Sequence, residues 1–435
     1  MIKKLTVGIL QETKYGSERR APLIPKDVRW LVKHGISVEV ETSPVRIFRD
    51  VEYKNAGAKI VQKFKSASLL VGIKEPQIRD LHSNTIYMLF SHVAKGQFQN
   101  MPLLKEFLHK KITLIDYEKI TDAKGHRLVY FGRFAGICGL VNSLYYLGKK
   151  LEWERARNPF SIIRPSYQYD SLEAIQHDFE RLNHHIYRRG FDKKIVPFMI
   201  GITGYGNVSK GAQEMLALLH PIEIHPHDML EFLRKRKFLH NRIYKIIFYR
   251  QGLVRSKNGE GFYFNDYLMH PKRFESNLDA YLPYLTMLIH GSYWDSRFPQ
   301  LVTEEMIQKL HRKGFRLKFI NDVSCDVKGG IELTYKPTTI DNPTFTYRVK
   351  KKDFVEGHEA KGISIMARDN LPAELPKDAT CHFSTLIREY VYQVASHGAK
   401  DITRHIEIPR EIRQAVITQN GKFAKNYNYL KKCLW

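Results

Sequence analysis

The sequence predicts an α/β protein of two domains, each built on a mainly parallel sheet, with a cleft between the domains. Its 435 residues are enough for two domains of ordinary size. Short apolar runs alternate with segments of helical period over about the first 150 residues, which is typical of βαβ units. A second strand–loop–helix unit begins near residue 195. With 43% hydrophobic and 26% charged residues, the composition is that of a globular protein.

The first domain is predicted to consist of short strands separated by helical segments. One helix begins at Pro25, because proline suits the first helical position, and it ends before Gly35. Strands that are separated in this way pair mostly in parallel. The predicted strands are Leu5–Leu10, Val38–Val40, Leu69–Ile73, Ile86–Phe90 and Thr113–Ile115.

Polar residues directly follow four of these strands. Ligands of parallel α/β sheets bind outside the carboxyl ends of the strands, so we expect these residues to line one crevice. Each charge taken alone would also suit an ordinary solvated loop. The segments are Glu12–Arg20, Lys74–Pro76, Ser91–His92 and Asp116–Glu118.

A glycine-rich turn follows the apolar strand near residue 195 and leads into a helical run. Gly204 permits a tight turn, Gly206 lets backbone N–H groups approach a pyrophosphate, and Gly211 allows close packing of the helix. The pattern predicts a Rossmann domain that binds a dinucleotide, although its spacing is not the standard GxGxxG and a βα turn without a ligand would fit it too. The residues expected to contact the cofactor here are Gly204, Gly206, Asn207, Val208, Ser209 and Gly211.

The next predicted strand, Pro221–His225, bears on the choice between NADPH and NADH. Enzymes that prefer NAD usually end this strand with Asp or Glu, which binds the ribose hydroxyls. Here His225 stands at the end, and basic residues follow soon after Asp228. We therefore predict that His225 contacts the cofactor and that NADPH is preferred, with NADH also accepted.

The net charge of +25 is unusually high and attracts anions. Basic residues concentrate between positions 232 and 250 and recur at Lys350–Lys352. No standard nucleic-acid-binding motif accompanies them, so we interpret the charge as a solvated basic surface and expect no nucleic-acid partner.

Cysteine spacing and hydropathy exclude several other classes of protein. Cys138, Cys325, Cys381 and Cys433 lie far apart and form no CxxC pair, so we predict neither a metal site nor a disulfide framework. No run approaches the roughly 20 apolar residues of a membrane helix, and the N-terminal apolar run ends too early for a signal peptide. We expect a cytoplasmic protein that has no membrane partner.

With these residues identified, the chain resembles the lysine–2-oxoglutarate reductase domain of the enzyme that makes saccharopine. It is more distantly similar to the lysine-forming saccharopine dehydrogenases of fungi and to alanine dehydrogenases. The shared order and spacing of eight short segments make the resemblance specific. The segments are Glu18–Leu23, Gly72–Pro76, Phe90–Lys95, Leu114–Glu118, Phe131–Gly136, Gly204–Ala212, Asp322–Asp326 and Asp369–Pro376.

The resemblance implies that the ε-amine of lysine condenses with the ketone of 2-oxoglutarate, and that a nicotinamide cofactor reduces the resulting imine to saccharopine. It also implies a role for each matching residue. Lys74 and His92 correspond to the acid–base pair, and Arg20 corresponds to a clamp on a substrate carboxylate. Lys95, Glu118 and Asp322 correspond to further substrate-binding positions. Asn370 falls where the chain passes the nicotinamide, and His290 stands close to the cofactor where the family commonly has Asn.

The chemistry favours these residue types on independent grounds. Forming and dehydrating a carbinolamine requires proton transfer near neutral pH, for which histidine is suited and lysine becomes suited once its pKa is lowered. Both substrates carry carboxylates, and arginine offers a planar bidentate fork for such groups.

We therefore expect a first domain of residues 1–150 plus about 360–400, a connector at 151–189, a Rossmann domain at 190–355 and a basic tail at 401–435. The animal and plant enzymes join the reductase to a second dehydrogenase, for which 435 residues leave no room, so we expect a free-standing reductase. The resemblance also implies a homo-oligomer.

Two alternatives remain open at this stage. One is a different amino-acid dehydrogenase or imine reductase on the same scaffold, which His290 supports. The other is a non-catalytic basic binding protein, which the net charge supports.

Overall fold

The computed structural model describes residues 4–14, 18–397 and 401–434 of the chain. Residues 1–3 of the predicted first domain and Trp435 of the predicted tail lie outside this part. The chain divides into a first unit, 1–131 with 376–435, and a second unit, 132–375. Among the described residues, no helix combines the length and apolar character needed to cross a bilayer.

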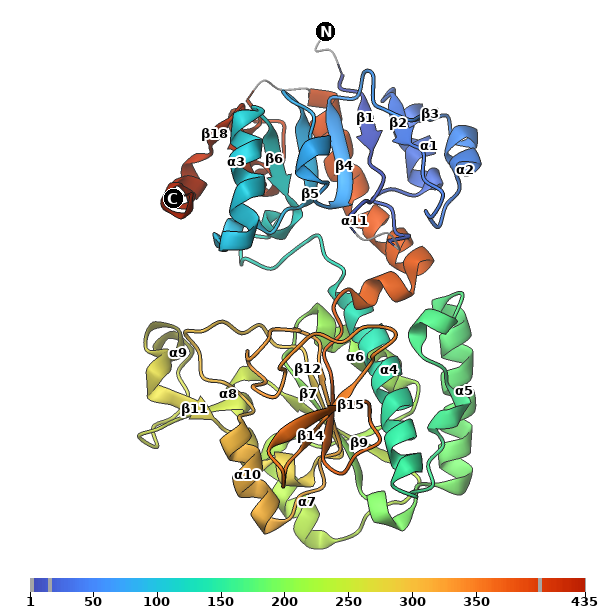
Figure 1. The fold of residues 1–435 in the computed structure, drawn as a ribbon, viewed down its shortest axis with the longest axis vertical. Coiled ribbons are helices and arrows are strands. Elements are labelled where there is room, and N and C mark those ends of the chain that lie inside the picture. The colour runs from blue at the N-terminus through green and yellow to red at the C-terminus, as the bar shows by residue number, and fades with distance from the viewer. Residues whose placement is uncertain (1–3, 15–17, 398–400, 435) are drawn as a thin grey trace. The chain divides into compact units, whose positions relative to one another are not determined.

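The first unit is built on an eight-stranded sheet (Figure 1). Its strands run parallel except for the antiparallel edge pair β17 and β18. The order across the sheet is β18 (Lys422–Phe423), β17 (Val416–Gln419), β6 (Thr113–Asp116), β5 (Ile86–Phe90), β4 (Leu69–Lys74), β1 (Val7–Ile9), β2 (Val38–Glu41) and β3 (Lys59–Val61). The helices are α1 (Pro25–Lys33), α2 (Asp50–Asn55), α3 (Met101–His109), α11 (Pro376–His397) and α12 (Arg410–Ala415).

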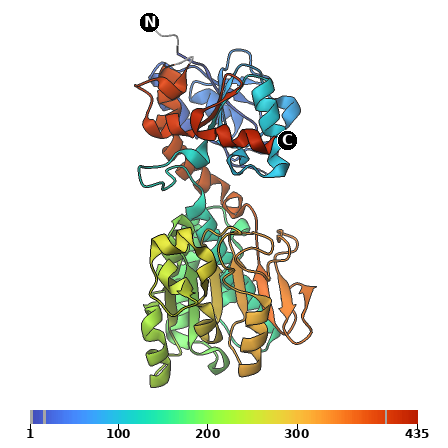
Figure 2. The same ribbon diagram turned by 90° about the vertical axis from the view of Figure 1, so that its left-hand side faces the viewer.

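The second unit repeats this plan with its own eight-stranded sheet. Figure 2 shows the antiparallel hairpin of β14 and β15 at one edge of that sheet. The order is β15 (Asp353–Glu356), β14 (Phe345–Arg348), β16 (Ile363–Met366), β13 (Phe319–Asp322), β12 (Met287–His290), β7 (Phe198–Thr203), β9 (Ile243–Phe248) and β8 (Ile222–Glu223). A separate two-stranded antiparallel sheet pairs β10 (Val254–Ser256) with β11 (Phe274–Ser276).

The helices of the second unit include a long one, α4, that begins where the unit begins. The helices are α4 (Gly132–Trp153), α5 (Leu172–Arg189), α6 (Asn207–Ala217), α7 (Met229–Lys235), α8 (Arg250–Leu253), α9 (Phe264–Met269) and α10 (Glu304–Lys313). The central strands β7, β12, β13 and β16 are buried along their whole length, as expected where helices cover both faces of a parallel sheet. Two mainly parallel α/β sheets confirm the predicted fold class.

The predicted strands of the first domain and its first helix are all present. The helix α1 begins at Pro25, and Gly35 beyond its end has φ +77°, as a helix-terminating glycine should. The unit boundaries differ from the predicted ones. The boundary expected near residue 150 falls inside α4, and the boundary near 360 falls at β16 rather than at the start of α11.

The predicted connector and tail are both parts of folded units. The amphipathic helix α5 buries Ile175, Phe179 and Leu182 in the second unit. The segment from residue 401 places Ile408 and Ile412 in the core of the first unit, and β17 pairs with β6. Its basic composition hid this role, because the apolar residues that enter the core are widely spaced.

Helix α4 packs against α6 through glycines. A β-carbon at Gly136 would lie 1.9 Å from the carbonyl oxygen of Val208, and one at Gly211 would lie 2.0 Å from that of Arg133. The contacting atoms are backbone, so neither can move aside like a side chain. Arg133 and Glu214 join the same two helices by an ion pair of 2.6 Å.

We therefore expect Gly211→Ala to destabilise the protein by about 3 kcal/mol or more, because overpacking against backbone exceeds the ordinary cost of a larger side chain. Gly252→Ala in α8 is the matched control, since its β-carbon would meet nothing closer than 4.0 Å. Alanine is the better helix former, so this control should be neutral or slightly stabilising. Urea unfolding of both variants measures the difference, and equal stabilities would contradict the packing argument.

Candidate active site

Four loops of the first unit meet at one edge of its sheet, because β6, β5, β4 and β1 are consecutive parallel neighbours. Lys74 ends β4 and pairs in register with Phe90 of β5, two residues before His92. Glu118 follows β6. The strand order therefore places Lys74, His92 and Glu118 at neighbouring strand ends, although they come from separate parts of the sequence.

His92 has a left-handed backbone, with φ +56° and ψ +10°. This conformation is uncommon for a residue with a side chain and persists only where neighbours hold it. The amide Nδ2 of Asn100 donates to the carbonyl of His92 at 3.0 Å, and the ring of Phe90 stacks on the imidazole with a centroid distance of 6.4 Å. The imidazole Nδ1 lies 3.7 Å from Glu118 Oε1, within ion-pair range. The histidine is thus fixed in place while a third of its side chain remains exposed.

Glu118 is an ionised carboxylate. Burial alone would raise its pKa, but the polar contact with His92 and the positive charges of Arg127 and Lys95 outweigh burial and lower the pKa to about 2. Arg127 Nη2 lies 3.2 Å from the same oxygen that faces His92. Lys95 is exposed in the short 3₁₀ helix Val93–Lys95, so its influence on Glu118 is electrostatic. Arg127 was not among the predicted residues, because a single basic residue in a polar loop carries no pattern.

Asp116, at the end of β6, lies behind this group and is fully buried. The hydroxyl of Ser91 donates to its Oδ2, and the N–H of Glu118 donates to its Oδ1 at 2.8 Å. Burial and the charge of Glu118 raise the pKa of Asp116 to about 6. Asp116 and Ser91 were noticed as strand-end residues, but nothing in the sequence distinguished their supporting role from a catalytic one.

Glu12, which follows β1 and begins the predicted polar segment Glu12–Arg20, is a second buried carboxyl, although no role was predicted for it. It accepts the N–H groups of Ile73 and Lys74 at 2.6 and 2.9 Å. Burial raises its pKa to about 7, and these two hydrogen bonds only partly oppose the effect. Glu12 therefore fixes the backbone on which Lys74 is carried.

Arg20 is 2% exposed and already engaged within its own loop. Its Nε and Nη2 donate to the two oxygens of Glu18 at 2.8 and 2.6 Å, and its guanidinium lies 4.4 Å above the ring of Phe131. Helix α11 anchors the loop, since Thr380 Oγ1 accepts the N–H of Ala21 at 3.2 Å. The Arg20 guanidinium was predicted to bind a substrate carboxylate. In the structure it binds the carboxylate of Glu18. Residues 15–17 of this predicted polar segment lie outside the described residues.

In the second unit, the glycine-rich turn lies between β7 and α6 as predicted. Gly204 has φ +85°, and a β-carbon there would lie 2.9 Å from Ser292 Oγ. A β-carbon at Gly206 would meet nothing within 4 Å, which leaves open space beside the first N–H groups of α6. Helix N-termini favour anions, so the turn fits a pyrophosphate. Asn207 and Val208 form the first turn of α6.

Ser209 and Gly211 face the protein interior rather than this open space. Both are buried in α6, and Ser209 Oγ accepts from Gln213 Nε2 at 3.0 Å. Gly211 provides the helix contact described above. These two residues therefore support the turn, while Gly206 and the N–H groups of Asn207 and Val208 stand where a dinucleotide phosphate would bind.

His290 ends β12 and is fully buried. Its Nδ1 lies 3.0 Å from Thr203 Oγ1 at the end of β7, and Thr203 Oγ1 also accepts the hydroxyl of Ser292 at 3.0 Å. Within the described part of the chain, its Nε2 has no hydrogen-bond partner. Burial lowers the pKa of His290, so the ring is neutral at physiological pH. His290 thus links two strand ends beside the glycine-rich turn.

Asp322 and Asn370 both lie at carboxyl ends of strands in the second unit. Asp322 ends β13, and its oxygens accept the hydroxyls of Ser324 and Thr334, each at 2.7 Å. It therefore orders the loop after β13. Asn370 follows β16 with φ +62°, and its carbonyl accepts the N–H of Ala373 at 2.9 Å.

The strand order bears on which residue lies nearest to the cofactor ribose, for which His225 was predicted. The predicted strand Pro221–His225 is only Ile222–Glu223, and this strand pairs with β9 rather than with β7. The neighbour of β7 on this side is β9, which ends at Phe248. The loop beside the glycine-rich turn therefore carries Tyr249 and Arg250, and exposed His225 lies one strand farther out. Local sequence could not reveal this, because β8 and β9 are both plausible neighbours of β7.

Comparison with known families finds two matching domain models. Residues 8–138 match the N-terminal domain of alanine dehydrogenase/PNT, and residues 284–426 match its C-terminal domain. Among solved structures, an L-alanine dehydrogenase aligns with a TM-score of 0.63 over 99% of this chain and all of the other, at 19% identity, which shows a shared fold.

Curated relatives are similar over most of the chain. It is 33% identical to saccharopine dehydrogenase [NAD(+), L-lysine-forming] of Yarrowia lipolytica, across 87% of this chain and 89% of that protein. It is also 33% identical to the alpha-aminoadipic semialdehyde synthases of Arabidopsis thaliana and Rattus norvegicus, across 98% and 99% of this chain. The matched regions are 41% and 48% of those two proteins, so the chain spans less than half of their length.

The raised pKa of Glu12 predicts a pH-dependent stability. The carboxyl has its ordinary pKa of 4.5 when the chain is unfolded and a pKa of about 7 when it is folded, so its contribution to stability is fully present below pH 4.5 and is lost as the pH rises through 7. We expect the stability of the wild type relative to Glu12→Gln to fall by about 2 kcal/mol between pH 5 and pH 8. Urea unfolding at both pH values measures this difference. Parallel stability profiles would show that the folded protein ionises Glu12 normally.

Proposed function

The chain belongs to the family of lysine-forming saccharopine dehydrogenases, and we propose that it catalyses the reductive condensation of L-lysine with 2-oxoglutarate to saccharopine. The reaction consumes one reduced nicotinamide and one proton and releases one water. The observation that carries the proposal is the placement of Lys74, His92 and Glu118 at adjacent strand ends. The proposal assigns the proton transfers to the first unit and the cofactor to the second.

His92 and Lys74 are proposed to move protons during formation and loss of the carbinolamine. As the ε-amine of lysine adds to the ketone carbon, the ketone oxygen gains a proton and the nitrogen loses one. The resulting hydroxyl must then be protonated to leave as water. A partly exposed, rigidly held imidazole beside an ionised carboxylate suits these transfers near neutral pH. When bound, the reduced cofactor would supply the hydride that adds to the imine carbon and leaves a secondary amine.

Glu118 and Glu12 are proposed to position these two groups. Glu118 stays ionised throughout the physiological range, so its charge can orient the imidazole at every step. Glu12 accepts the N–H of Lys74 and thereby fixes the direction in which that side chain leaves the strand. Neither role requires direct contact with a substrate.

The carboxylates of both substrates need cations, and the first unit offers several near His92. Arg127 and Lys95 are exposed, so we propose that they attract the substrate carboxylates. Arg20 holds Glu18 through Nε and Nη2, and its contact with substrate stays a prediction.

We propose NADPH as the preferred cofactor, bound with its pyrophosphate at Gly206 and the first turn of α6. Arg250, in the loop after β9, is proposed to bind the 2′-phosphate, because β9 is the strand next to β7. This assignment replaces His225 with Arg250 as the residue that selects the cofactor. The cytoplasmic location and the homo-oligomer stay predictions.

The direct test is oxidation of NADPH by the purified protein, followed by loss of its absorbance, with lysine, 2-oxoglutarate or both. Oxidation that requires both substrates supports the proposal. Oxidation with another amine or keto acid, and none with this pair, would favour a different amino-acid dehydrogenase. No oxidation by the folded protein with either NADPH or NADH would overturn the enzymatic assignment.

Removal of the proposed proton-transfer groups should affect turnover strongly. We expect Lys74→Met and His92→Gln each to lower kcat by about 100-fold or more. Lys105→Met and His126→Gln make the same exchanges at exposed positions of the first unit and should retain activity. Steady-state kinetics measure all four variants, and near wild-type turnover in both site variants would refute the assignment.

The strand order makes a separate prediction about cofactor choice. We expect Arg250→Gln to lower the ratio of kcat/KM for NADPH over NADH by about tenfold, because the charge facing the 2′-phosphate is lost. His225→Gln should leave this ratio unchanged. The opposite pattern would place the ribose at the end of β8 and contradict the proposed position of the cofactor.

A further inference from the structure

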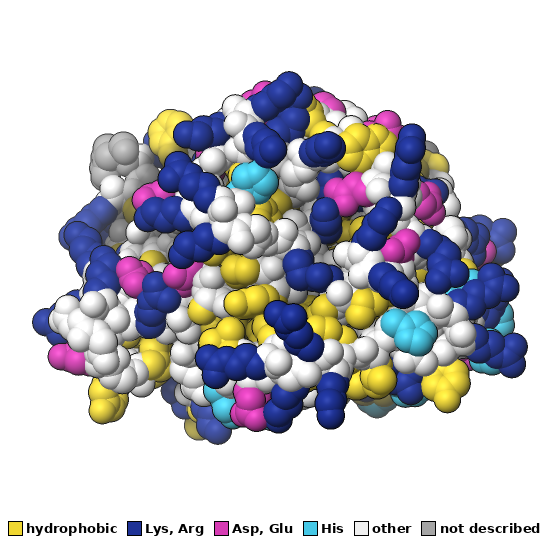
Figure 3. Space-filling model, turned by 90° about the horizontal axis from the view of Figure 1, so that it is seen from below, with side chains coloured by type: hydrophobic (Ala, Val, Ile, Leu, Met, Phe, Trp, Pro, Cys, Tyr) yellow, Lys and Arg dark blue, Asp and Glu magenta, His cyan; other side chains and the backbone are white. Residues whose placement is uncertain are grey.

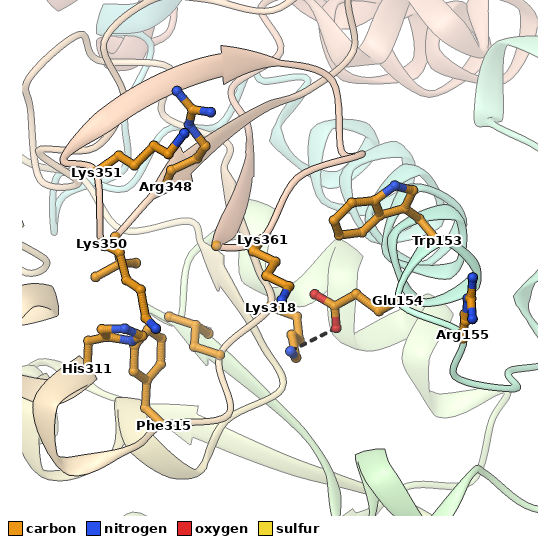
Figure 4. A pocket seen from close by; sticks show the side chains of 13 residues that line it. Trp153, Glu154, Arg155, His311, Phe315, Lys318, Arg348, Lys350, Lys351 and Lys361 are labelled. Atoms are coloured by element: carbon orange, nitrogen blue, oxygen red, sulfur yellow. Dashed lines mark ion pairs between the residues drawn. The ribbon is translucent and has the colours of Figure 1, made fainter.

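We propose that the second unit carries a binding site for a nucleoside polyphosphate, separate from the glycine-rich turn. The site is a pocket of about 740 Å³, a volume in the range of small-molecule sites. The end of α4, the segment after α10 and the residues just before β13 and β16 form its walls (Figure 4). The inference is independent of the proposed reaction.

The pocket is strongly cationic. Among the described residues that line it, only Glu154 carries a carboxylate. The Nζ of Lys318 lies 2.8 Å from Oε2 of Glu154 and pairs with it. Arg348 is likewise paired, with Asp353. The basic lining residues are Arg155, Lys318, Arg348, Lys350, Lys351 and Lys361.

The remaining cations are not held in ion pairs, although Lys351 acts electrostatically on Asp353, with which Arg348 already pairs. Among the residues that the structure describes, Arg155, Lys350, Lys351 and Lys361 form no ion pair within 4.0 Å, and all four are exposed. Unpaired cations gathered around one cavity bind multiply charged anions, and a chain of phosphates supplies such charge at matching spacing. Figure 3 shows basic side chains spread over one face of the molecule with apolar side chains between them.

Aromatic rings in the same pocket favour an anion that carries a planar ring. The indole of Trp153 lines the pocket and is 40% exposed, so part of its ring surface is open to a ligand. Phe315 packs edge-on against His311, with ring centroids 5.7 Å apart. Exposed rings beside cations are the usual platform for a nucleobase, which stacks while its phosphates contact the charges.

The position in the sheet separates this pocket from the proposed cofactor site. Lys318 and Gly362 immediately precede β13 and β16, whereas the glycine-rich turn follows the last residue of β7. Since β7, β13 and β16 run parallel within one sheet, the two sites lie at opposite ends of the strands. A dinucleotide at the turn therefore leaves the pocket accessible.

The experiment is calorimetric titration of the full chain with ATP, adenosine and inorganic tripolyphosphate, with and without NADPH. We expect ATP to bind at least about tenfold more tightly than either fragment, because stacking and charge act together. Saturating NADPH should not displace ATP. Absence of ATP binding, or displacement by NADPH, would overturn the proposal.

Variants locate the site and separate its two parts. Lys350→Gln with Lys361→Gln should weaken ATP and tripolyphosphate by about tenfold or more, and Trp153→Leu should weaken ATP alone. Lys313→Gln is the matched control, since Lys313 is exposed at the end of α10 but does not line the pocket. An equal loss in the control would mean general charge attraction, and equal affinity for ATP and tripolyphosphate would mean a simple anion site. Either result would contradict the proposal.

Discussion

The parallel order of β6, β5, β4 and β1 is the constraint on which the candidate active site depends. Parallel strands end on the same side, so residues separated by more than a hundred positions meet at one edge. Glu12, Lys74, His92 and Glu118 stand at or just after the ends of four different strands and share that edge. A change in strand order would separate them even if every strand kept its local structure.

Buried carboxyl groups give this edge its rigidity. An isolated buried carboxylate is costly, and each one here has specific donors or cations. Glu12 accepts two backbone N–H groups, Asp116 accepts a hydroxyl and a backbone N–H, and Glu118 faces Arg127 and His92. Breaking these polar contacts would leave buried carboxyl groups without partners, which costs free energy, so the contacts hold the loops together. Groups that transfer protons need such a defined geometry.

Local patterns predicted the features that depend on neighbouring residues. Periodicity identified the strands of the first unit, and glycine spacing identified the turn at Gly204 and Gly206 with its helix. Pairing between distant segments was not accessible in this way. The position of β9 beside β7, on which the proposed contact of Arg250 with the cofactor depends, is set by tertiary pairing. The pairing of β17, which follows residue 400, with β6 of the first sheet depends on tertiary structure in the same way. The pairing of Arg20 with its neighbour Glu18 was equally hidden, because sequence does not show which carboxylate an arginine selects.

The proposed reaction joins two substrates through a carbon–nitrogen bond and reduces that same carbon. Mass spectrometry of the product formed with reduced cofactor deuterated at the transferred position tests it most directly. We expect one product that contains the carbon skeletons of lysine and 2-oxoglutarate, linked by a secondary amine, with one deuterium on the former ketone carbon. A deuterated product that contains only one of the two skeletons would contradict it.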